Sequence, residues 1–249
     1  LANEGNFELY HAGQTVPIEV STAGITFLGF KNRGAMDQFL YTSPETMQLN
    51  TRHSLYSDTA AYYLRLNEDG GTNFFAAPTI TGVPSVATEI IRQEEVVFSE
   101  EYVKEYFRSG RSSIYYSRYD HVEGFASRDG SDLLSADGTT ITEIDFALPA
   151  ATGGPARLDT RFGLGFEFHE QRISADNNLI YALDTNAWTV HQPSVEFQPG
   201  ANGTTIKFEG TFGARDKASI AWARVTYPAA PVADDGLKSF LIPASTVPT

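Results

Sequence analysis

The chain has 249 residues, 41% of them hydrophobic and 12% aromatic, so it can bury a core, and this composition argues against wholesale disorder. Its formal net charge is −13, from 18 basic and 31 acidic residues, which argues against nucleic acid as a partner because phosphate binding needs clustered lysine and arginine. There is no cysteine, which excludes disulfides, thiolate metal sites and cysteine nucleophiles.

The N-terminal part of the sequence is typical of short strands joined by turns. A hairpin is expected around Gly13, and the turn signal NEDGG ends the last strand before the proline-containing stretch 71–90, which favours extended coil. From the alternation of apolar side chains we predict strands at 7–11, 15–20, 25–30, 61–66 and 94–98.

One segment is predicted to be a helix. Ser99 is a suitable N-cap, and acidic side chains in the first turn, at Glu100 and Glu101, complement the helix dipole. Tyr102 and Tyr106 would then share one face, so we expect a short helix over 99–107.

From Ser113 onward the strands become regular and the turns frequent, which predicts an antiparallel β-sandwich of the jelly-roll type. The expected strands lie at 114–117, 142–148, 156–168, 179–184, 194–198, 204–209 and 219–227. In the run RLDTRFGLGFEF apolar residues recur at every second position, so one face of that strand is expected to be buried. The predicted core contributors are Tyr119, Phe125, Phe162, Phe166 and Val225.

The fold class predicted from these elements is all-β and mostly antiparallel, with at most one or two short helices. We expect an N-terminal β-rich module over 1–110, a jelly-roll-like β-sandwich over 111–229, and a linker with the start of a further element over 230–249. No apolar run approaches the ~20 residues of a membrane span, and no signal peptide is visible. The chain is therefore expected to be an internal fragment or a processed form.

Several stretches of the sequence follow one another in a distinctive order. They are FELYHAGQTVPIEV at 7–20, GITFLGFKNRGAMDQFLYTSP at 24–44, SLYSDTAAYYLRL at 54–66, YSRYDHVEGF at 116–125 and IAWARVTYP at 220–228. In this order the chain resembles the gingipain-type cysteine peptidases, most closely the sortase-like peptidases of the type IX secretion system. Val122 stands where that family commonly has glycine, and Phe125 where it commonly has tryptophan.

The resemblance implies a non-catalytic role. In the family these stretches precede a catalytic domain that uses a Cys–His pair, and this chain has no cysteine. The chain then corresponds to an accessory N-terminal region of an exported peptidase precursor, located in the periplasm, at the outer-membrane surface or outside the cell. Its partner would be the downstream catalytic domain of the same polypeptide.

No catalytic or cofactor-binding residue is assigned from the sequence. It contains neither a GxSxG nucleophile elbow nor a nucleotide fingerprint, and any pairing of its strand carboxylates is arbitrary. A structural calcium ion is the one cofactor considered, with Asp120, Glu123 and Asp216 as candidate ligands, because calcium needs several converging oxygens. The ordinary interpretation is that these acidic residues lie in solvent-exposed turns and bind no metal ion.

Aromatic side chains are the remaining candidates for binding. Trp188, Tyr115 and Tyr116 could stack on sugar rings or anchor a partner protein, although such residues more often fill a core or an interface. The alternative function is therefore an independent carbohydrate- or protein-binding jelly-roll module, acting on a cell-surface protein or glycan. A concave face with exposed Trp or Tyr would favour this binding module, and a flat apolar patch would favour packing on another domain.

Overall fold

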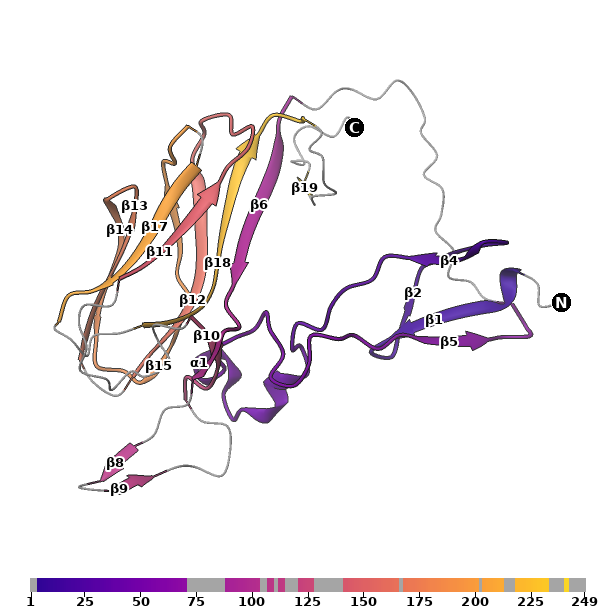
Figure 1. Cartoon of the computed structure of the whole chain (residues 1–249), viewed down its shortest axis with the longest axis horizontal. Coiled ribbons are helices and arrows are strands. Elements are labelled where there is room, and N and C mark those ends of the chain that lie inside the picture. Colours follow the sequence, from indigo (N-terminus) through magenta and orange to yellow (C-terminus); the bar gives the residue numbers. More distant parts are fainter. Residues whose placement is uncertain are drawn as a thin grey trace. The chain divides into compact units, whose positions relative to one another are not determined.

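The computed structural model describes residues 4–70, 88–103, 107–109, 112–114, 121–127, 141–165, 168–201, 203–212, 218–232 and 240–241. The chain divides into two compact units. The N-terminal unit comprises Leu1–Arg33 and Tyr56–Pro84, and the sandwich unit comprises Gly34–Leu55 and Ser85–Thr249. The described elements are almost all strands, which confirms the predicted all-β, mostly antiparallel class (Figure 1). None of the described helices has the length and hydropathy of a membrane-spanning helix.

The N-terminal unit is built from a three-stranded sheet and a hairpin. Its elements are η1 (Glu4–Asn6), β1 (Phe7–His11), β2 (Gln14–Val16), β3 (Ile18–Ser21), β4 (Gly24–Phe27) and β5 (Tyr63–Leu66). The sheet has the order β2-β1-β5, and β3 pairs with β4. The predicted strand at 15–20 is divided into β2 and β3 at Pro17, because proline has no backbone N–H to donate to a ladder.

The sandwich unit contains two large antiparallel sheets. The four-stranded sheet has the order β11 (Ile141–Ala147), β17 (Gly203–Gly210), β13 (His169–Ala175), β14 (Asn178–Thr185). The six-stranded sheet has the order β15 (Thr189–His191), β12 (Ala156–Leu164), β18 (Ala218–Ala229), β6 (Ile90–Val97), β19 (Phe240–Leu241), with β16 (Ser194–Phe197) also paired to β12. Figure 1 shows these sheets as two layers.

Shorter elements complete the sandwich unit. They are η2 (Asp37–Leu40), α1 (Pro44–Met47), the pair β7 (Glu101–Val103) with β10 (Gly124–Ala126), and the pair β8 (Phe107–Ser109) with β9 (Ser112–Ile114).

The main core lies between the two large sheets. Every second residue of β13 and β17 is buried, so one face of the four-stranded sheet meets this core. The buried cluster draws side chains from both sheets, including Phe146 on β11, Phe208 on β17 and Tyr227 on β18. Phe162 and Val225 belong to it with 1% and 0% exposure, as predicted.

The central strands of the six-stranded sheet are buried on both faces. All residues of β12 from Leu158 to Leu164 are buried, as is the first half of β18. A second cluster covers the face turned away from the main core, and it consists of Leu49, Val103, Val122, Ala126, Val190, Ala221 and Trp222. The segment 44–55 and the β7–β10 pair thus form an outer layer of the sandwich unit, which the alternation pattern alone does not predict.

Arg161 on β12 fixes this outer layer to the sheet. Its side chain is 4% exposed, and burial lowers the pKa of Arg161 to about 10. The guanidinium donates at 2.6–3.1 Å to the backbone carbonyls of Pro44, Glu45, Gln48 and Leu49 and to Gln192 Oε1. Pro44 and Glu45 belong to α1, and Gln48 and Leu49 directly follow it; the Pro44 carbonyl also accepts from the Gln48 N–H at 3.2 Å.

Asn50 makes a second polar connection within the outer layer. Its Nδ2 donates to the carbonyls of Phe98 at 3.0 Å and Phe125 at 2.9 Å. Its Oδ1 accepts from the backbone N–H groups of Arg52 at 2.8 Å and His53 at 3.0 Å. The same Nδ2 lies 3.4 Å from the Ala221 carbonyl, so one buried amide joins a loop to three other chain segments that are distant in sequence.

Two sequence-based expectations are wrong. The helix predicted over 99–107 is not formed at Glu101–Val103, which is strand β7, because pairing with β10 places Val103 in the second cluster at 1% exposure. The boundary predicted between 110 and 111 is also wrong, because β6 pairs along its whole length with β18 in one sheet. Phe125 is half-buried and lies edge-on to His53 and Tyr102, while Tyr119 and Phe166 lie outside the described residues.

Val122 adopts a backbone conformation that a β-branched residue rarely takes. Its φ is +60°, in the left-handed region, which glycine adopts without the steric cost that a β-branched side chain brings. Such strain costs about 1–3 kcal/mol and persists only where the surroundings enforce it. The side chain of Val122 is fully buried against Gly163, where an added Cβ would overlap Val122 Cγ1 and lie 3.1 Å from Leu49 Cδ1.

We expect Gly163→Ala to lower the free energy of unfolding by about 1–3 kcal/mol, because the added methyl group overpacks the site. In a Val122→Ala background the same change should cost much less, since the clashing Cγ1 is absent. Denaturant unfolding of the two single variants and the double variant measures this coupling. Strictly additive effects would contradict the contact.

We expect Arg161→Lys to lower the free energy of unfolding by about 3 kcal/mol, because an ammonium group cannot replace the planar set of guanidinium donors. Arg157→Lys is the matched control on the same strand, since its side chain is 49% exposed and its ion pair with Asp159 lies near the surface. That control should change stability by less than about 1 kcal/mol in the same denaturant melt. Equal effects of the two substitutions would refute the anchoring role of Arg161.

Candidate functional site

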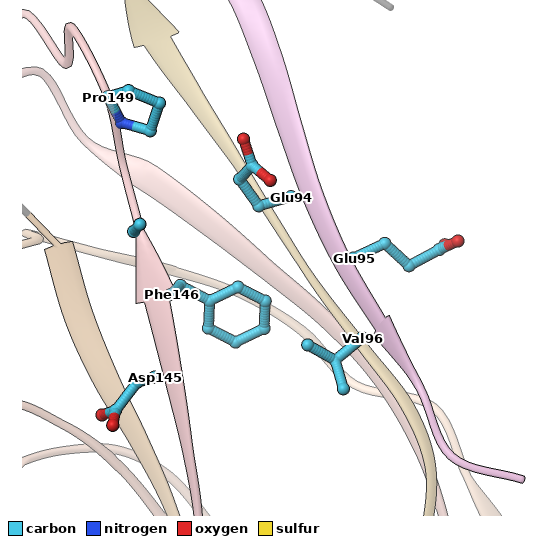
Figure 2. Close-up of a pocket in the computed structure, with 7 residues that line it drawn as sticks. Glu94, Glu95, Val96, Asp145, Phe146 and Pro149 are labelled. Carbon is cyan, nitrogen blue, oxygen red and sulfur yellow. The ribbon is translucent and has the colours of Figure 1, made fainter. Parts of the chain in front are cut away.

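A cleft of about 290 Å³ lies in the sandwich unit between β6 and β11, which belong to different sheets. It is lined by Glu94, Glu95, Val96, Asp145, Phe146, Ala147 and Pro149. Figure 2 shows the Phe146 ring reaching from β11 toward Val96 on β6. The cleft is therefore an opening at the edge of the sandwich, with apolar side chains between the two sheets.

Strand register determines which of the three acids faces the cleft. Glu94 is opposite Val225, which is fully buried in the main core, so Glu94 occupies a core-facing position of β6. Glu95 is on the other face, 3.7 Å from Arg52, and Asp145 accepts a hydrogen bond from Thr205 Oγ1 at 2.6 Å. Figure 2 shows both Glu95 and Asp145 turned away from Phe146. The cleft thus combines one carboxylate with an apolar wall, and a carboxylate can accept hydrogen bonds from hydroxyl or ammonium groups.

The N-terminal unit has an apolar face on its three-stranded sheet. Because cross-strand partners share a face, Leu64 and Leu66 on β5 lie on the same side as their partners Leu9 and Phe7 on β1. β5 is an edge strand, and Leu64 and Leu66 are each 52% exposed. We call this surface the apolar face.

A pocket of about 390 Å³ lies in the same unit, and we call it the N-terminal pocket. It is lined by His11, Ala12, Gln14, Thr15, Val16, Pro17, Leu28, Phe30 and Tyr62. By alternation along the chain, Tyr62 is on the same side as Leu64, so the pocket continues the apolar face. Leu28 and Phe30 remain 62% and 64% exposed.

Hydrogen bonds and ring stacking hold the walls of the N-terminal pocket. The Tyr62 hydroxyl accepts from the Phe30 N–H at 2.6 Å and donates to the Phe30 carbonyl at 3.1 Å. The His11 ring stacks on Tyr62 with centroids 4.6 Å apart and planes inclined by 22°. His11 Nδ1 lies 3.0 Å from the Ala61 carbonyl, which can only accept, so Nδ1 carries the proton.

The sequence-derived site candidates are not brought together in the part of the chain that the structure describes. Asp120, Asp216, Tyr115 and Tyr116 lie outside the described residues. Glu123 is 4% exposed and accepts a hydrogen bond from the Tyr102 hydroxyl at 2.5 Å. Among the described residues there is no group of three or more His, Asp or Glu side chains that could hold a metal ion.

Trp188 does not form an open aromatic platform. It is partly buried, packs against the second cluster and lies 5.1 Å from the His121 ring, centroid to centroid. Its surroundings are those of a packing residue at the margin of the outer layer. Sequence reasoning did not indicate Glu94 or Tyr62, since their positions depend on strand register and on contacts with distant residues.

Two histidines are close to the main core, of which His169 is buried and His191 is half-buried. His191 on β15 stacks on Phe162 with centroids 5.7 Å apart, and its Nε2 has no hydrogen-bond partner among the described residues. Burial, and to a smaller degree the nearby His169, lowers the pKa of His191 below its ordinary value of about 6.5. The folded chain therefore disfavours the protonated form of this ring.

No family model matches this chain, and no curated protein matches it. Among solved structures, dimeric latent PorU from Porphyromonas gingivalis is similar over 94% of this chain, with 9% identity and a TM-score of 0.48. The chain spans 22% of the length of that protein. A family 35 carbohydrate-binding module from Clostridium thermocellum is similar over 56% of this chain and 98% of its own, with 15% identity and a TM-score of 0.31. With TM-scores this low, these likenesses assign neither an activity nor a ligand to the present chain.

We expect the free energy of unfolding of the wild-type chain to fall as the pH is lowered from about 7 to about 5. The free energy of unfolding of the His191→Gln variant should fall less steeply over the same range. Since the pKa of His191 is lower in the folded chain, its contribution to stability is complete above the unfolded pKa and is lost as the pH drops toward the folded pKa. Denaturant melts at several pH values in this range provide the measurement. Parallel curves for the wild type and the variant would show that His191 has no such role.

Proposed function

We propose that this chain is a non-catalytic accessory region of an exported gingipain-type cysteine peptidase precursor. In this proposal it packs on, or positions, a catalytic domain of the same polypeptide, in the periplasm, at the outer-membrane surface or outside the cell. The observation that carries the proposal is the apolar face of the N-terminal unit, together with the exposed side chains around the N-terminal pocket.

The exposure of these side chains supports packing on another domain. Leu28, Phe30, Leu64 and Leu66 are each more than half exposed, although all four are large and apolar. Scattered exposed leucines are normal on a protein surface, but these residues gather on one small unit, beside an apolar pocket. Burying such side chains contributes roughly 1.5–3 kcal/mol each when they are fully covered. A partner domain that covered them would therefore gain much of its association energy here.

The sequence motifs support a peptidase catalytic domain as the proposed partner. The stretches 7–20 and 54–66, on which the resemblance to gingipain-type peptidases depends, contain β1 and β5, the strands that make the apolar face. A role without catalysis accords with the absence of cysteine from the sequence. It also accords with the placement of the acids: Glu94, Glu95 and Asp145 line one cleft, but only Glu94 faces into it.

The second candidate is an independent binding module for a glycan or a protein. The cleft between β6 and β11 is the observation in its favour, because a carboxylate beside Phe146 and Val96 can hold hydroxyl groups against an apolar wall. The described aromatic residue proposed for a sugar platform, Trp188, is instead part of the outer layer. Among the described residues, this candidate therefore depends on the cleft that Glu94, Val96 and Phe146 line.

The test is association of this chain with the catalytic domain of its polypeptide, produced separately and measured by titration calorimetry. We expect Leu64→Ser combined with Leu66→Ser to weaken association by roughly tenfold or more, because both side chains lose apolar burial. Leu179→Ser is the matched control, since Leu179 is 60% exposed but belongs to β14 of the sandwich unit. Absence of association, together with glycan binding that Glu94→Gln abolishes, would replace the accessory role with the binding module.

A further inference from the structure

The N-terminal pocket is more selective for its occupant than a plain apolar surface, because its walls combine apolar side chains with one polar ring. We propose that it receives a tyrosine or tryptophan side chain from the partner protein, that is, a planar ring that carries an O–H or N–H donor. This inference deepens the proposed function and rests on it. It names the chemistry of the contact that the apolar face makes.

The first argument is that the pocket exists before anything binds. Both backbone polar groups of Phe30 are bonded to the Tyr62 hydroxyl, so the chain at 30 cannot close over the pocket without losing two hydrogen bonds. Pro17 has a fixed φ, and the stacked His11 ring holds Tyr62 from the other side. A ligand therefore enters a formed pocket and does not have to order its walls.

The second argument is the shape and chemistry of the walls. The pocket measures about 390 Å³, within the range of sites that hold small ligands or single side chains. Val16, Pro17 and Leu28 supply aliphatic surface, while Phe30 and Tyr62 supply aromatic rings. Aromatic rings pair favourably with one another in offset or edge-to-face arrangements, which favours an aromatic ligand over an aliphatic one.

The third argument is the single ring nitrogen that remains available. His11 Nδ1 donates to the Ala61 carbonyl, so in the neutral ring Nε2 carries the lone pair and can only accept a hydrogen bond. His11 lines the pocket, and no described residue donates to its Nε2. Of the other polar side chains of the lining, Gln14 and Thr15 are exposed to solvent, and the Tyr62 hydroxyl is bonded to the Phe30 backbone. A ring with its own donor would satisfy the His11 acceptor, and a plain hydrocarbon ring would not.

The fourth argument concerns the source of the ring. A free small molecule in the pocket would cover only the parts of Leu28 and Phe30 that line it, and these side chains are 62% and 64% exposed. A side chain on a protein surface fills the pocket while its neighbours cover these two residues and the adjoining Leu64 and Leu66. The continuity of the pocket with the apolar face therefore favours a protein as the source.

The test uses three small probes on the intact chain: 4-methylphenol and 3-methylindole, which mimic the two side chains, and toluene, which lacks the donor. Side-chain NMR signals of Tyr62 and His11 report occupancy of the pocket. We expect both donor-bearing probes to bind with dissociation constants in the millimolar range, and toluene to bind about 2- to 10-fold more weakly. His11→Phe keeps a ring against Tyr62 but removes the acceptor, so it should abolish the preference for 4-methylphenol over toluene. Glu94→Gln, in the other unit, should leave all three affinities unchanged.

Competition separates this inference from the proposed function. If the catalytic domain associates with the chain, a large excess of 4-methylphenol should weaken that association by several-fold. Association that 4-methylphenol does not affect would overturn the inference and leave the accessory role intact. Probe binding with the expected preference but no association would refute the accessory role and the protein source of the ring. Equal binding of toluene and 4-methylphenol, or no probe binding, would overturn the inference outright.

Discussion

The buried guanidinium of Arg161 is the constraint on which the layered structure of the sandwich unit depends. It makes a charged residue compatible with a strand that is covered on both faces, because its donors bond to backbone carbonyls of the outer layer and to Gln192 Oε1. The same side chain donates to the carbonyls of Pro44 and Glu45, and these bonds connect the short helix α1 to β12. The cost of desolvation is visible in the lowered pKa of Arg161, and the outer layer that results allows Val122 to keep its strained backbone.

Much of the fold can be predicted from the local sequence pattern. The predictions fail where contacts with residues distant in sequence determine the secondary structure or the domain boundary. The strand at 7–11 was predicted with its observed bounds, and the alternation that placed Phe162 in the core also holds. The helix expected over 99–107 has good capping signals. Burial of Val103 in the second cluster, whose other members are distant in sequence, outweighs this local helix propensity. The predicted domain boundary failed for the same reason, since nothing near 90–97 in sequence indicates pairing with β18.

The candidate sites were less predictable than the fold. A glutamate within EEVVF is an ordinary strand residue until the register with β18 shows that Glu94, and not Glu95, faces the interior. His11 was one strand histidine among five, and its role as an acceptor depends on the carbonyl of Ala61, fifty positions later. Trp188 is a candidate for stacking from its residue type alone, but its half-buried position against the second cluster depends on residues that are distant in sequence. The chemical type of each side chain is known from the sequence, whereas the direction in which the side chain points is not.

The split organisation of the N-terminal unit has a consequence for the order of folding. The chain leaves that unit after Arg33, contributes 34–55 to the sandwich unit, and returns at Tyr56. During synthesis, β1 and β5 can pair soon after both have emerged. The hydrogen bond from Arg161 to the Pro44 carbonyl cannot form until Arg161, 117 residues later, has been synthesised. The outer layer therefore closes late and has a high contact order. We expect its closure to limit the folding rate more than the formation of the β1–β2 or the β3–β4 hairpin does.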